Sequence, residues 1–293
     1  MPKILLPIDV EHPHENLIEQ LDKLIELKGA QVLMLYVKDE LPGYETTLGT
    51  MGNFPEDLKH QIEAKVNEIF GGLKTKLESK GATVTTQIAG GLAASTIEAV
   101  AREGKFDMIA MTAGTHSRVQ QYLLGSTAGR VIGHVPCSVI VLKNVPSTPM
   151  KNVVIGIDGS DAALSAAKAA VQLLGLNGRE VQINLINVVS VKSIYKFISP
   201  VQFVAAIEDN LVMSGEAGLA AAEKELSDLG ITKMDNVLKN GDPSDEIIKF
   251  ADSISADLIV LGAQGKSAVE RFLMGSVSSR VATFSKCSIA VIK

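Results

Sequence analysis

The sequence contains an internal repeat, because residues of the first half reappear in the same order 150 positions later (241 − 91 = 150 for Gly91 and Gly241). The matching residues include Gly125-Ser126 and Gly275-Ser276, Arg130 and Arg280, and Cys137–Val141 and Cys287–Val291. Two copies of a unit of about 145 residues are therefore favoured over one large domain. The segment Asn144–Met150 between the copies has two prolines, a composition that stops strands and helices. We expect one domain at 1–144 and a second at 151–293.

Each copy alternates short aliphatic runs with longer segments of helical spacing. In the second copy the expected strands are Val153–Ile157, Val181–Val188, Met234–Lys239, Asp257–Leu261 and Ser288–Ile292. The expected helices are Ser160–Leu174, Pro200–Leu229, Pro243–Ala251 and Gly275–Ser285, and the first copy has a long helix near Pro55–Lys80. Aliphatic strands that are buried on both faces and joined by helices are typical of a parallel sheet. Each copy is therefore predicted to be a doubly wound α/β unit with five strands.

The composition excludes several classes of protein. Lys and Arg number 28 against 33 Asp and Glu, a net charge of −5, and aromatic residues make up only 4% with no Trp. A nucleic-acid binder needs a basic face or stacking aromatic side chains, so this class is not expected. No apolar run approaches the roughly 20 residues that span a bilayer, and Asp9 comes too early for a signal peptide. We expect a soluble, cytoplasmic protein that acts neither on nucleic acid nor at a membrane.

The candidate site lies in the loops that follow the first and fourth strands of the second copy. In open α/β sheets, ligands bind beyond the carboxyl ends of the strands where the strand order reverses. Gly262, Gly265 and Gly275-Ser276 suit an anion, because glycine lets backbone N–H groups approach phosphate oxygens and a helix N-terminus attracts negative charge. Asp158, across the crevice, can accept hydrogen bonds from a base or a sugar. The alternative is that the glycines only make a tight turn and that Ser276 and Asp158 cap helices.

Other motifs in the sequence give weaker evidence for a functional site. Gly262–Ser267 has two residues between its glycines where a P-loop requires four, and Gly125–Gly129 lacks the central serine of a hydrolase elbow. His12-Pro13-His14 could chelate a metal weakly, but a surface turn is favoured and no metal site is predicted. Cys137 and Cys287 open the last strand of each copy, where burial as small apolar side chains is expected. For Arg130 and Arg280, surface ion pairs are favoured over a phosphate clamp.

The spacing Gly262-x2-Gly265-x9-Gly275-Ser276, after a strand and before a helix, resembles the ATP-binding signature of the universal stress protein family. Val153–Ser160, Gly241-Asp242-Pro243 and Cys287–Val291 resemble further motifs of that family, and the resemblance covers both halves nearly end to end. The chain is therefore identified as a tandem member. The resemblance implies two five-stranded sheets of order 3-2-1-4-5, of the adenine nucleotide alpha hydrolase-like type, related by a pseudo-twofold axis. It also implies bound ATP or AMP, with or without Mg²⁺.

By the same resemblance, the nucleotide lies in the crevice between strands 1 and 4. Asp158 would contact the adenine end, and Val188 or Val189 would line its pocket. The residues expected to hold the ribose and phosphates are Gly262, Gly265, Gly275, Ser276 and Val277. Gly156 occupies a position where the family often has Val, Ala or Pro, a difference expected to loosen the adenine wall.

The first copy departs from the signature. Gly262 and Gly265 become Thr112 and Thr115, whose side chains would crowd a phosphate, although Gly125-Ser126 is retained and Gly114 offers flexibility one residue early. Glu11 adds negative charge near the expected crevice. We expect one good nucleotide site, in the C-terminal half. The last strands, Ser138–Leu142 and Ser288–Ile292, are expected to pair with each other as in a homodimer of single domains; further dimerisation is left open.

These observations predict an ATP- or AMP-binding, stress-response regulatory protein with little or no hydrolysis. No His or Glu is placed by the sequence beside a γ-phosphate, so no catalytic residue is assigned. Two alternatives stay open. One is a slow ATPase or nucleotidyl transferase whose Mg²⁺ is held by the phosphates and Ser276. The other is a nucleotide-free scaffold, or a protein that binds another small ligand.

Overall fold

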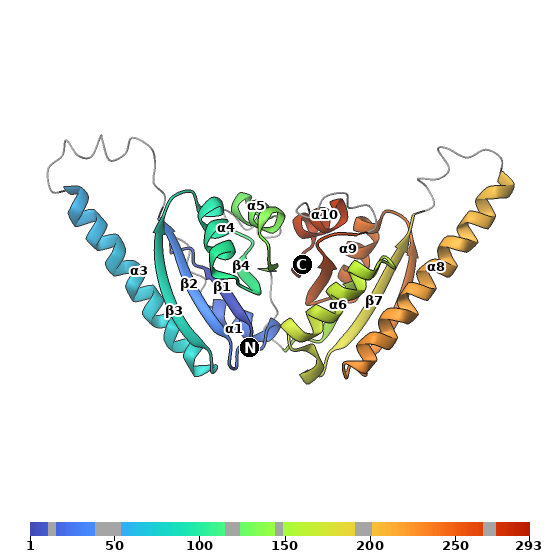
Figure 1. Cartoon of the computed structure of the whole chain (residues 1–293), viewed down its shortest axis with the longest axis horizontal. Coiled ribbons are helices and arrows are strands. Elements are labelled where there is room, and N and C mark those ends of the chain that lie inside the picture. The colour runs from blue at the N-terminus through green and yellow to red at the C-terminus, as the bar shows by residue number, and fades with distance from the viewer. Residues whose placement is uncertain (11–15, 39–53, 115–123, 144–148, 191–200, 266–273) are drawn as a thin grey trace.

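The computed structural model of the chain describes residues 1–10, 16–38, 54–114, 124–143, 149–190, 201–265 and 274–293 (Figure 1). The first half contains β1 (Lys3–Pro7), α1 (Leu17–Leu24), β2 (Gln31–Lys38), α3 (Phe54–Ser79), β3 (Thr83–Gly90), α4 (Ala93–Gly104), β4 (Met108–Thr112), α5 (Ser126–His134) and β5 (Ser138–Leu142). The second half contains β6 (Asn152–Gly156), α6 (Asp161–Leu173), the 3-10 turn η2 (Leu176–Gly178), β7 (Gln182–Val189), α8 (Val201–Asp228), β8 (Met234–Asn240), α9 (Pro243–Ser253), β9 (Leu258–Gly262), α10 (Ser276–Phe284) and β10 (Ser288–Ile292). Each helix in the described part of the chain is either too short or too polar to span a bilayer.

The strands form one continuous sheet in the order β3-β2-β1-β4-β5-β10-β9-β6-β7-β8. Within each half every strand pair is parallel, so each half has the order 3-2-1-4-5 that was expected. The halves meet through the expected pairing of the last strands, since β5 and β10 run antiparallel. Ile140 lies opposite Ala290, its own counterpart in the repeat, and this register places an approximate twofold axis between the two strands.

Helices cover both faces of this sheet, which confirms the doubly wound arrangement. Alternate residues of β1 point to opposite faces: Ile4 and Leu6 pack in one hydrophobic cluster and Leu5 packs in the other. The first cluster also contains side chains of α1, α3, α6 and α8, and the second contains side chains of α4, α5, α9 and α10. Figure 1 shows α3 and α8 along the outer sides of a V-shaped molecule, with α5 and α10 near its centre.

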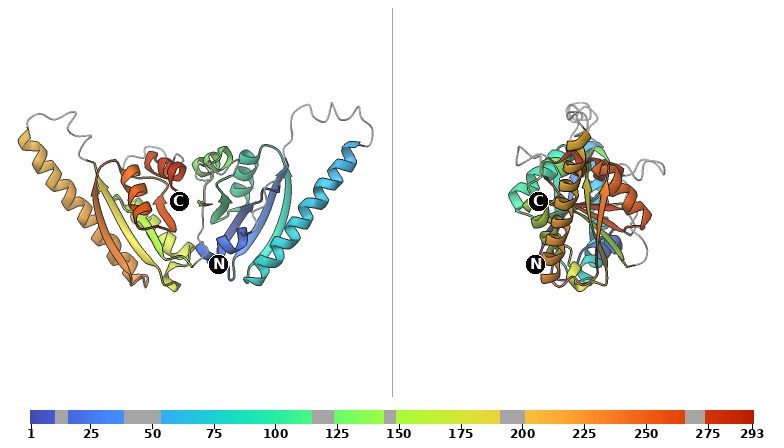
Figure 2. Two further views of the ribbon diagram at one scale, coloured as in Figure 1. Left: turned by 180° about the vertical axis from the view of Figure 1, so that it is seen from behind. Right: turned by 90° about the vertical axis from the view of Figure 1, so that its right-hand side faces the viewer.

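The position of each strand in the sheet follows from its composition. All five residues of β5 and of β10 are buried, as their aliphatic sequences require at the centre of a sheet covered on both faces. The outermost strands β3 and β8 carry Thr, Gln, Asp, Asn and Lys, and most of their residues are exposed or half-buried. Polar side chains on an edge strand discourage pairing with another chain. The view from behind in Figure 2 shows both chain termini near the middle of the molecule, away from these edges.

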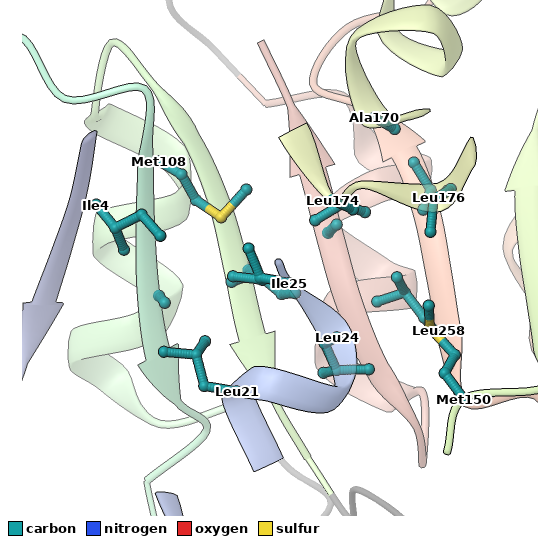
Figure 3. Close-up of a cluster of buried hydrophobic side chains, with 14 of the residues drawn as sticks. Ile4, Leu21, Leu24, Ile25, Met108, Met150, Ala170, Leu174, Leu176 and Leu258 are labelled. Carbon is teal, nitrogen blue, oxygen red and sulfur yellow. The ribbon is translucent and has the colours of Figure 1, made fainter. Parts of the chain in front are cut away.

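The two halves share their hydrophobic cores. Leu21, Leu24 and Ile25 at the end of α1 lie beside Leu174 and Leu176 of the second half, and all five are completely buried (Figure 3). Burying a leucine or isoleucine contributes about 1.5–3 kcal/mol relative to leaving it exposed. Each half therefore depends on the other for part of its stability.

Candidate functional site

A cavity of about 340 Å³ lies at the carboxyl ends of β6 and β9, where the strand order of the second half reverses. It is built from the loops after β6, β7 and β9 together with the first turns of α9 and α10 and one face of α8. The residues singled out from the sequence all line it: Asp158, Val188, Gly262, Gly265, Gly275, Ser276 and Val277. The fold therefore brings together seven residues that are widely separated in the sequence.

Asp158, directly after β6, is held by the start of α6. The backbone N–H and the hydroxyl of Ser160 both donate to Oδ1 of Asp158, at 2.9 and 2.6 Å. Ser160 is itself the N-cap of α6, since its Oγ accepts a hydrogen bond from the N–H of Ala163 at 3.1 Å. The other carboxylate oxygen, Oδ2, faces Gly265, where an added Cβ would lie 2.7 Å away. Asp158 is thus oriented toward the glycine loop and does not cap a helix, so that alternative is wrong.

The start of α10 is joined to the end of β9. The N–H of Gly275 donates to the carbonyl of Ala263 at 2.8 Å, and the Ser278 hydroxyl donates to the carbonyl of Gly262 at 2.7 Å. Gly275 is the N-cap, so Ser276 is the first helical residue and the alternative that Ser276 caps this helix is wrong. The first intrahelical bond runs from Ser279 N to Gly275 O. The N–H groups of residues 276 to 278 precede it and have no acceptor within the helix, as at any helix N-terminus. They form a positively polarised wall of the cavity.

Opposite this wall, the cavity is apolar with a few polar groups. Ile157, Ile186 and Leu261 contribute aliphatic surface, and α8 adds Leu211. The Nδ2 group of Asn187 donates to the carbonyl of Ile157 at 2.7 Å, which ties the ends of β6 and β7 together. An apolar wall combined with a small number of fixed polar groups is the usual composition of a small-molecule site.

The expectation that Gly156 loosens this wall is wrong. A Cβ on Gly156 would overlap Cδ2 of Leu261, and the Leu261 side chain is buried. The leucine thus occupies the space that a larger residue at position 156 would take. Glycine and leucine complement each other across the two neighbouring strands.

The contribution of α8 was not predicted from the sequence. Gly215 lines the cavity, and a Cβ there would lie 2.8 Å from Cδ1 of Leu238 and 3.0 Å from Oδ1 of Asn187. Gly218, one turn later, would place a Cβ 3.0 Å from Cα of Gly159. These two glycines let the helix approach the loop after β6 closely. The signal in the sequence was a pair of glycines three residues apart inside a long helical pattern, where each costs about 1 kcal/mol relative to alanine.

Within the described residues of the first half, α3 carries larger side chains at the positions that correspond to the small residues of α8. Leu77 and Leu226 are equivalent, because each carbonyl accepts the N–H of the residue five positions later. Counting back from them, Val66 corresponds to Gly215, Ile69 to Gly218 and Leu73 to Ala222. Val66 is buried in the core, and Ile69 and Leu73 pack against it. Among the described residues, a small space of about 30 Å³ at the strand ends of the first half is lined by Pro7, Ile8, Asp9, Leu17, Ile69, Leu73 and Thr112.

The structure places three of the other residues singled out in the first half. Thr112 lies at the end of β4 in this small space, as its alignment with Gly262 implies. Gly114 has a positive φ of 84°, and Gly125 is the N-cap of α5. Glu11 and Thr115 lie outside the described residues.

The described lining of the cavity holds one charged side chain, and the two repeated arginines form ion pairs outside it. Asp158 is the only ionisable side chain among the described residues that line the cavity. Arg280 on α10 forms ion pairs with Asp245 at 2.9 Å and Asp242 at 3.6 Å, and Arg130 on α5 pairs with Glu98 at 3.6 Å. The ion-pair interpretation of these two arginines is confirmed.

Burial makes both cysteines unreactive as thiolates. Cys137 is buried and Cys287 is half-buried, and burial raises the pKa of these thiols to about 11 and about 12, so the reactive thiolate is disfavoured. His12-Pro13-His14 lies outside the described residues. Within the part of the chain that the structure describes, no group of three or more His, Cys, Asp or Glu side chains could hold a metal ion.

Comparison with known proteins agrees on one family. The model of the universal stress protein family matches residues 1–143 and 149–293. A universal stress protein of Methanocaldococcus jannaschii is 34% identical over 143 residues, which are 49% of this chain and 82% of that protein. The structure of a Pseudomonas aeruginosa protein described as functionally unknown aligns with all of this chain. The alignment covers 92% of that protein (15% identity, TM-score 0.67). The alignment with a universal stress protein of Archaeoglobus fulgidus also covers all of this chain, and it covers 96% of that protein (20% identity, TM-score 0.63). These two structures share the fold of the whole chain.

Proposed function

Because this chain belongs to the universal stress protein family, we propose that it is a stress-response regulatory protein that binds ATP or AMP in the cavity of its C-terminal half. The observation that carries this proposal is the meeting of three features in one cavity: an oriented carboxylate, a glycine loop and the first turn of a helix. A nucleotide has a matching set of parts, since its base is flat and largely apolar while its phosphates carry the charge.

The cavity fits such a ligand in size and in polarity. Its volume of about 340 Å³ lies within the ~300–1,000 Å³ that is usual for small-molecule sites. The apolar wall formed by Ile157, Ile186 and Val188 suits the base, with Asp158 accepting hydrogen bonds at that end. The amides of Ser276 and Val277 and the backbone of the glycine loop would receive the phosphates. The Ser276 hydroxyl would donate a further hydrogen bond and could ligate a Mg²⁺ ion carried in by the phosphates.

In this proposal the two domains differ in role. The domain at 151–293 binds the nucleotide. No site is assigned to the domain at 1–144, because among its described residues Val66, Ile69 and Leu73 take positions that are glycine or alanine in the second domain. The first domain would still support the second through the shared sheet and core.

Binding without rapid turnover is favoured over catalysis. A general base must lie within hydrogen-bond reach of the attacking water, either directly or through one other water. Among the described residues of the cavity only Asp158 ionises, and its Oδ1 already accepts two hydrogen bonds from Ser160. We assign this carboxylate to recognition of the base and assign no catalytic residue.

The experiment has two parts. First, the purified chain is denatured by heat and the released small molecules are identified by mass spectrometry, with an adenine nucleotide as the expected result. Second, nucleotide-free protein is titrated with ATP, AMP and adenosine. ATP and AMP should bind more tightly than adenosine, because only they present phosphate to the amides of α10. Equal affinity for all three would contradict the phosphate cradle, and no binding would favour the scaffold alternative. Gly265→Asp should weaken ATP binding, whereas Gly178→Asp, where a Cβ meets no atom within 4 Å, should not.

A further inference from the structure

A lysine of the first half ends inside the second half. Lys143 follows β5, and its side chain crosses to the C-terminal end of α10, where Nζ donates to the carbonyls of Ala282 at 2.7 Å and Ser285 at 3.0 Å. The residue is only 2% exposed. Its backbone is fixed as well, because its N–H donates to Oγ of Ser288 at 3.1 Å and its carbonyl accepts from the same hydroxyl at 2.9 Å. A buried ammonium group therefore holds the last carbonyls of α10.

This helix has its two ends in different environments. Its first turn, beginning at Ser276, faces the cavity, and its last turn, ending at Phe284, meets Lys143. Nine helical residues span only about 13 Å at ~1.5 Å per residue. The positive end of the helix dipole thus points at the proposed phosphate position, and the negative end points at a buried positive charge. An anion at the first end and a cation at the second both stabilise the same helix dipole.

We propose that Lys143 of the first domain is a positioning residue for the nucleotide site of the second domain, because it fixes α10 so that the first-turn amides stay aligned with the phosphates. The inference rests on the proposed function for its ligand, but its effect on α10 is independent of any ligand. It gives the domain without a site a direct part in binding.

The repeat supplies a symmetric counterpart. Lys293 follows β10 as Lys143 follows β5, and its N–H donates to Oγ of Ser138 at 3.2 Å. Its Nζ donates to the carbonyl of Val135, directly after α5. The helix α5 belongs to the domain to which the proposed function assigns no nucleotide, so Lys293 is the matched lysine at a helix without a proposed phosphate. Leu24 is completely buried and belongs to the hydrophobic cluster on the face of the sheet opposite α10, so it provides a control for a general loss of stability.

The test compares Lys143→Met, Lys293→Met and Leu24→Ala in the full chain. Each is measured by calorimetric titration with ATP and by hydrogen exchange of the α10 amides from Ser279 onward, without nucleotide. Lys143→Met should weaken ATP binding roughly threefold to thirtyfold, the range for removing a charge from a helix end, and should speed exchange in α10. Lys293→Met and Leu24→Ala should leave ATP affinity within about twofold of the parent chain. Lys143→Gln, which keeps an N–H donor without the charge, should give an intermediate loss of affinity. It replaces Lys143→Met in the comparison if Lys143→Met does not fold.

Two results would overturn the inference: unchanged ATP affinity in Lys143→Met, or an equal loss in all three variants. If the parent chain binds no nucleotide, the proposed function fails. Hydrogen exchange then tests by itself whether Lys143 fixes α10. Faster exchange confined to α10 in Lys143→Met would then support it, and unchanged or uniformly faster exchange would overturn it.

Discussion

A Cβ on Gly265 would lie 2.7 Å from Oδ2 of Asp158. The loop after β9 therefore approaches the loop after β6 so closely that only a glycine leaves the carboxylate in place. Because Oδ1 of the same carboxylate is held by Ser160, Asp158 cannot turn away without losing hydrogen bonds. The two loops form one recognition element, and substitutions in either should affect the same ligand.

Gly265→Ala should lower ATP affinity tenfold or more and lower the free energy of unfolding by about 1–3 kcal/mol, because the displaced carboxylate loses hydrogen bonds to Ser160. The added methyl group meets the end of a movable side chain, so it displaces the carboxylate while leaving the backbone in place. Gly178→Ala is the matched control, since a Cβ there meets nothing within 4 Å and should alter neither quantity much. Calorimetry and urea denaturation measure the two quantities. Unchanged ATP affinity in Gly265→Ala would show that this loop does not contact the ligand.

Ser160→Ala should reduce both stability and binding. It removes the N-cap hydrogen bond to Ala163, which is worth about 1 kcal/mol, and one of two donors to Asp158. Ser165→Ala, at an exposed position on the same helix, serves as the control. If thermal denaturation shows the loss of stability while ATP affinity stays at the parent value, the orientation of Asp158 is not important for binding.

Gly215→Val should abolish nucleotide binding, because it introduces the residue found at the equivalent position of the first half, the buried Val66. The valine would crowd Leu238 and Asn187, and overpacking of this kind costs about 1–3 kcal/mol. Gly72→Val, in α3 at a position with nothing within 4 Å of a Cβ, separates the effect of valine on a helix from the effect on the cavity. Titration of both variants with ATP shows whether the loss of binding is specific to position 215. Retained binding in Gly215→Val would mean that the ligand lies away from α8.

Stability should depend on pH through Lys143. Burial lowers the pKa of this ammonium from 10.5 to about 8 in the folded chain. Between these two values the unfolded chain holds more protons than the folded chain, so the lysine's contribution to the free energy of unfolding rises with pH, by up to about 3 kcal/mol. Below about pH 8 both states are protonated and the contribution is constant.

Urea denaturation of the parent chain and Lys143→Met from pH 7 to 10.5 measures this contribution as a difference. The difference is needed because other groups titrate in the same range. Burial raises the pKa of the Cys137 and Cys287 thiols and so lowers stability above about pH 9, and burial also lowers the pKa of Lys293. The free energy of unfolding of the parent chain should rise relative to that of Lys143→Met as the pH increases above 8. A constant difference would contradict a buried, titrating ammonium.

Features set by local sequence were predictable. Aliphatic runs such as Ser288–Ile292 predicted strands buried on both faces, and the structure has β10 at those residues. Asp242-Pro243 begins α9 as N-cap and first residue, a pairing that the helical pattern from Pro243 already indicated. The glycine spacing placed Gly265 and Gly275 in the loops of one cavity because parallel strands carry their carboxyl ends to the same edge.

Features that depend on the distance between packed elements were not predictable. The pattern of α8 shows that Gly215 lies in a helix but not which loop the helix approaches. The sequence of β6 gives Gly156 without revealing that Leu261 fills its space. Likewise, a single lysine after β5 does not indicate that its ammonium group crosses the joint between the halves to reach the end of α10. These relationships exist only once both elements are in place.

The decisive quantity is the number of nucleotides that one chain binds. Calorimetric titration of the nucleotide-free full chain with ATP gives this number, and equilibrium dialysis can check it independently. We expect one ATP per chain, lost in Gly215→Val, because the cavity of about 340 Å³ in the second half is lined by Gly215, where the first half has the buried Val66. Two equivalent sites per chain, or none, would contradict it.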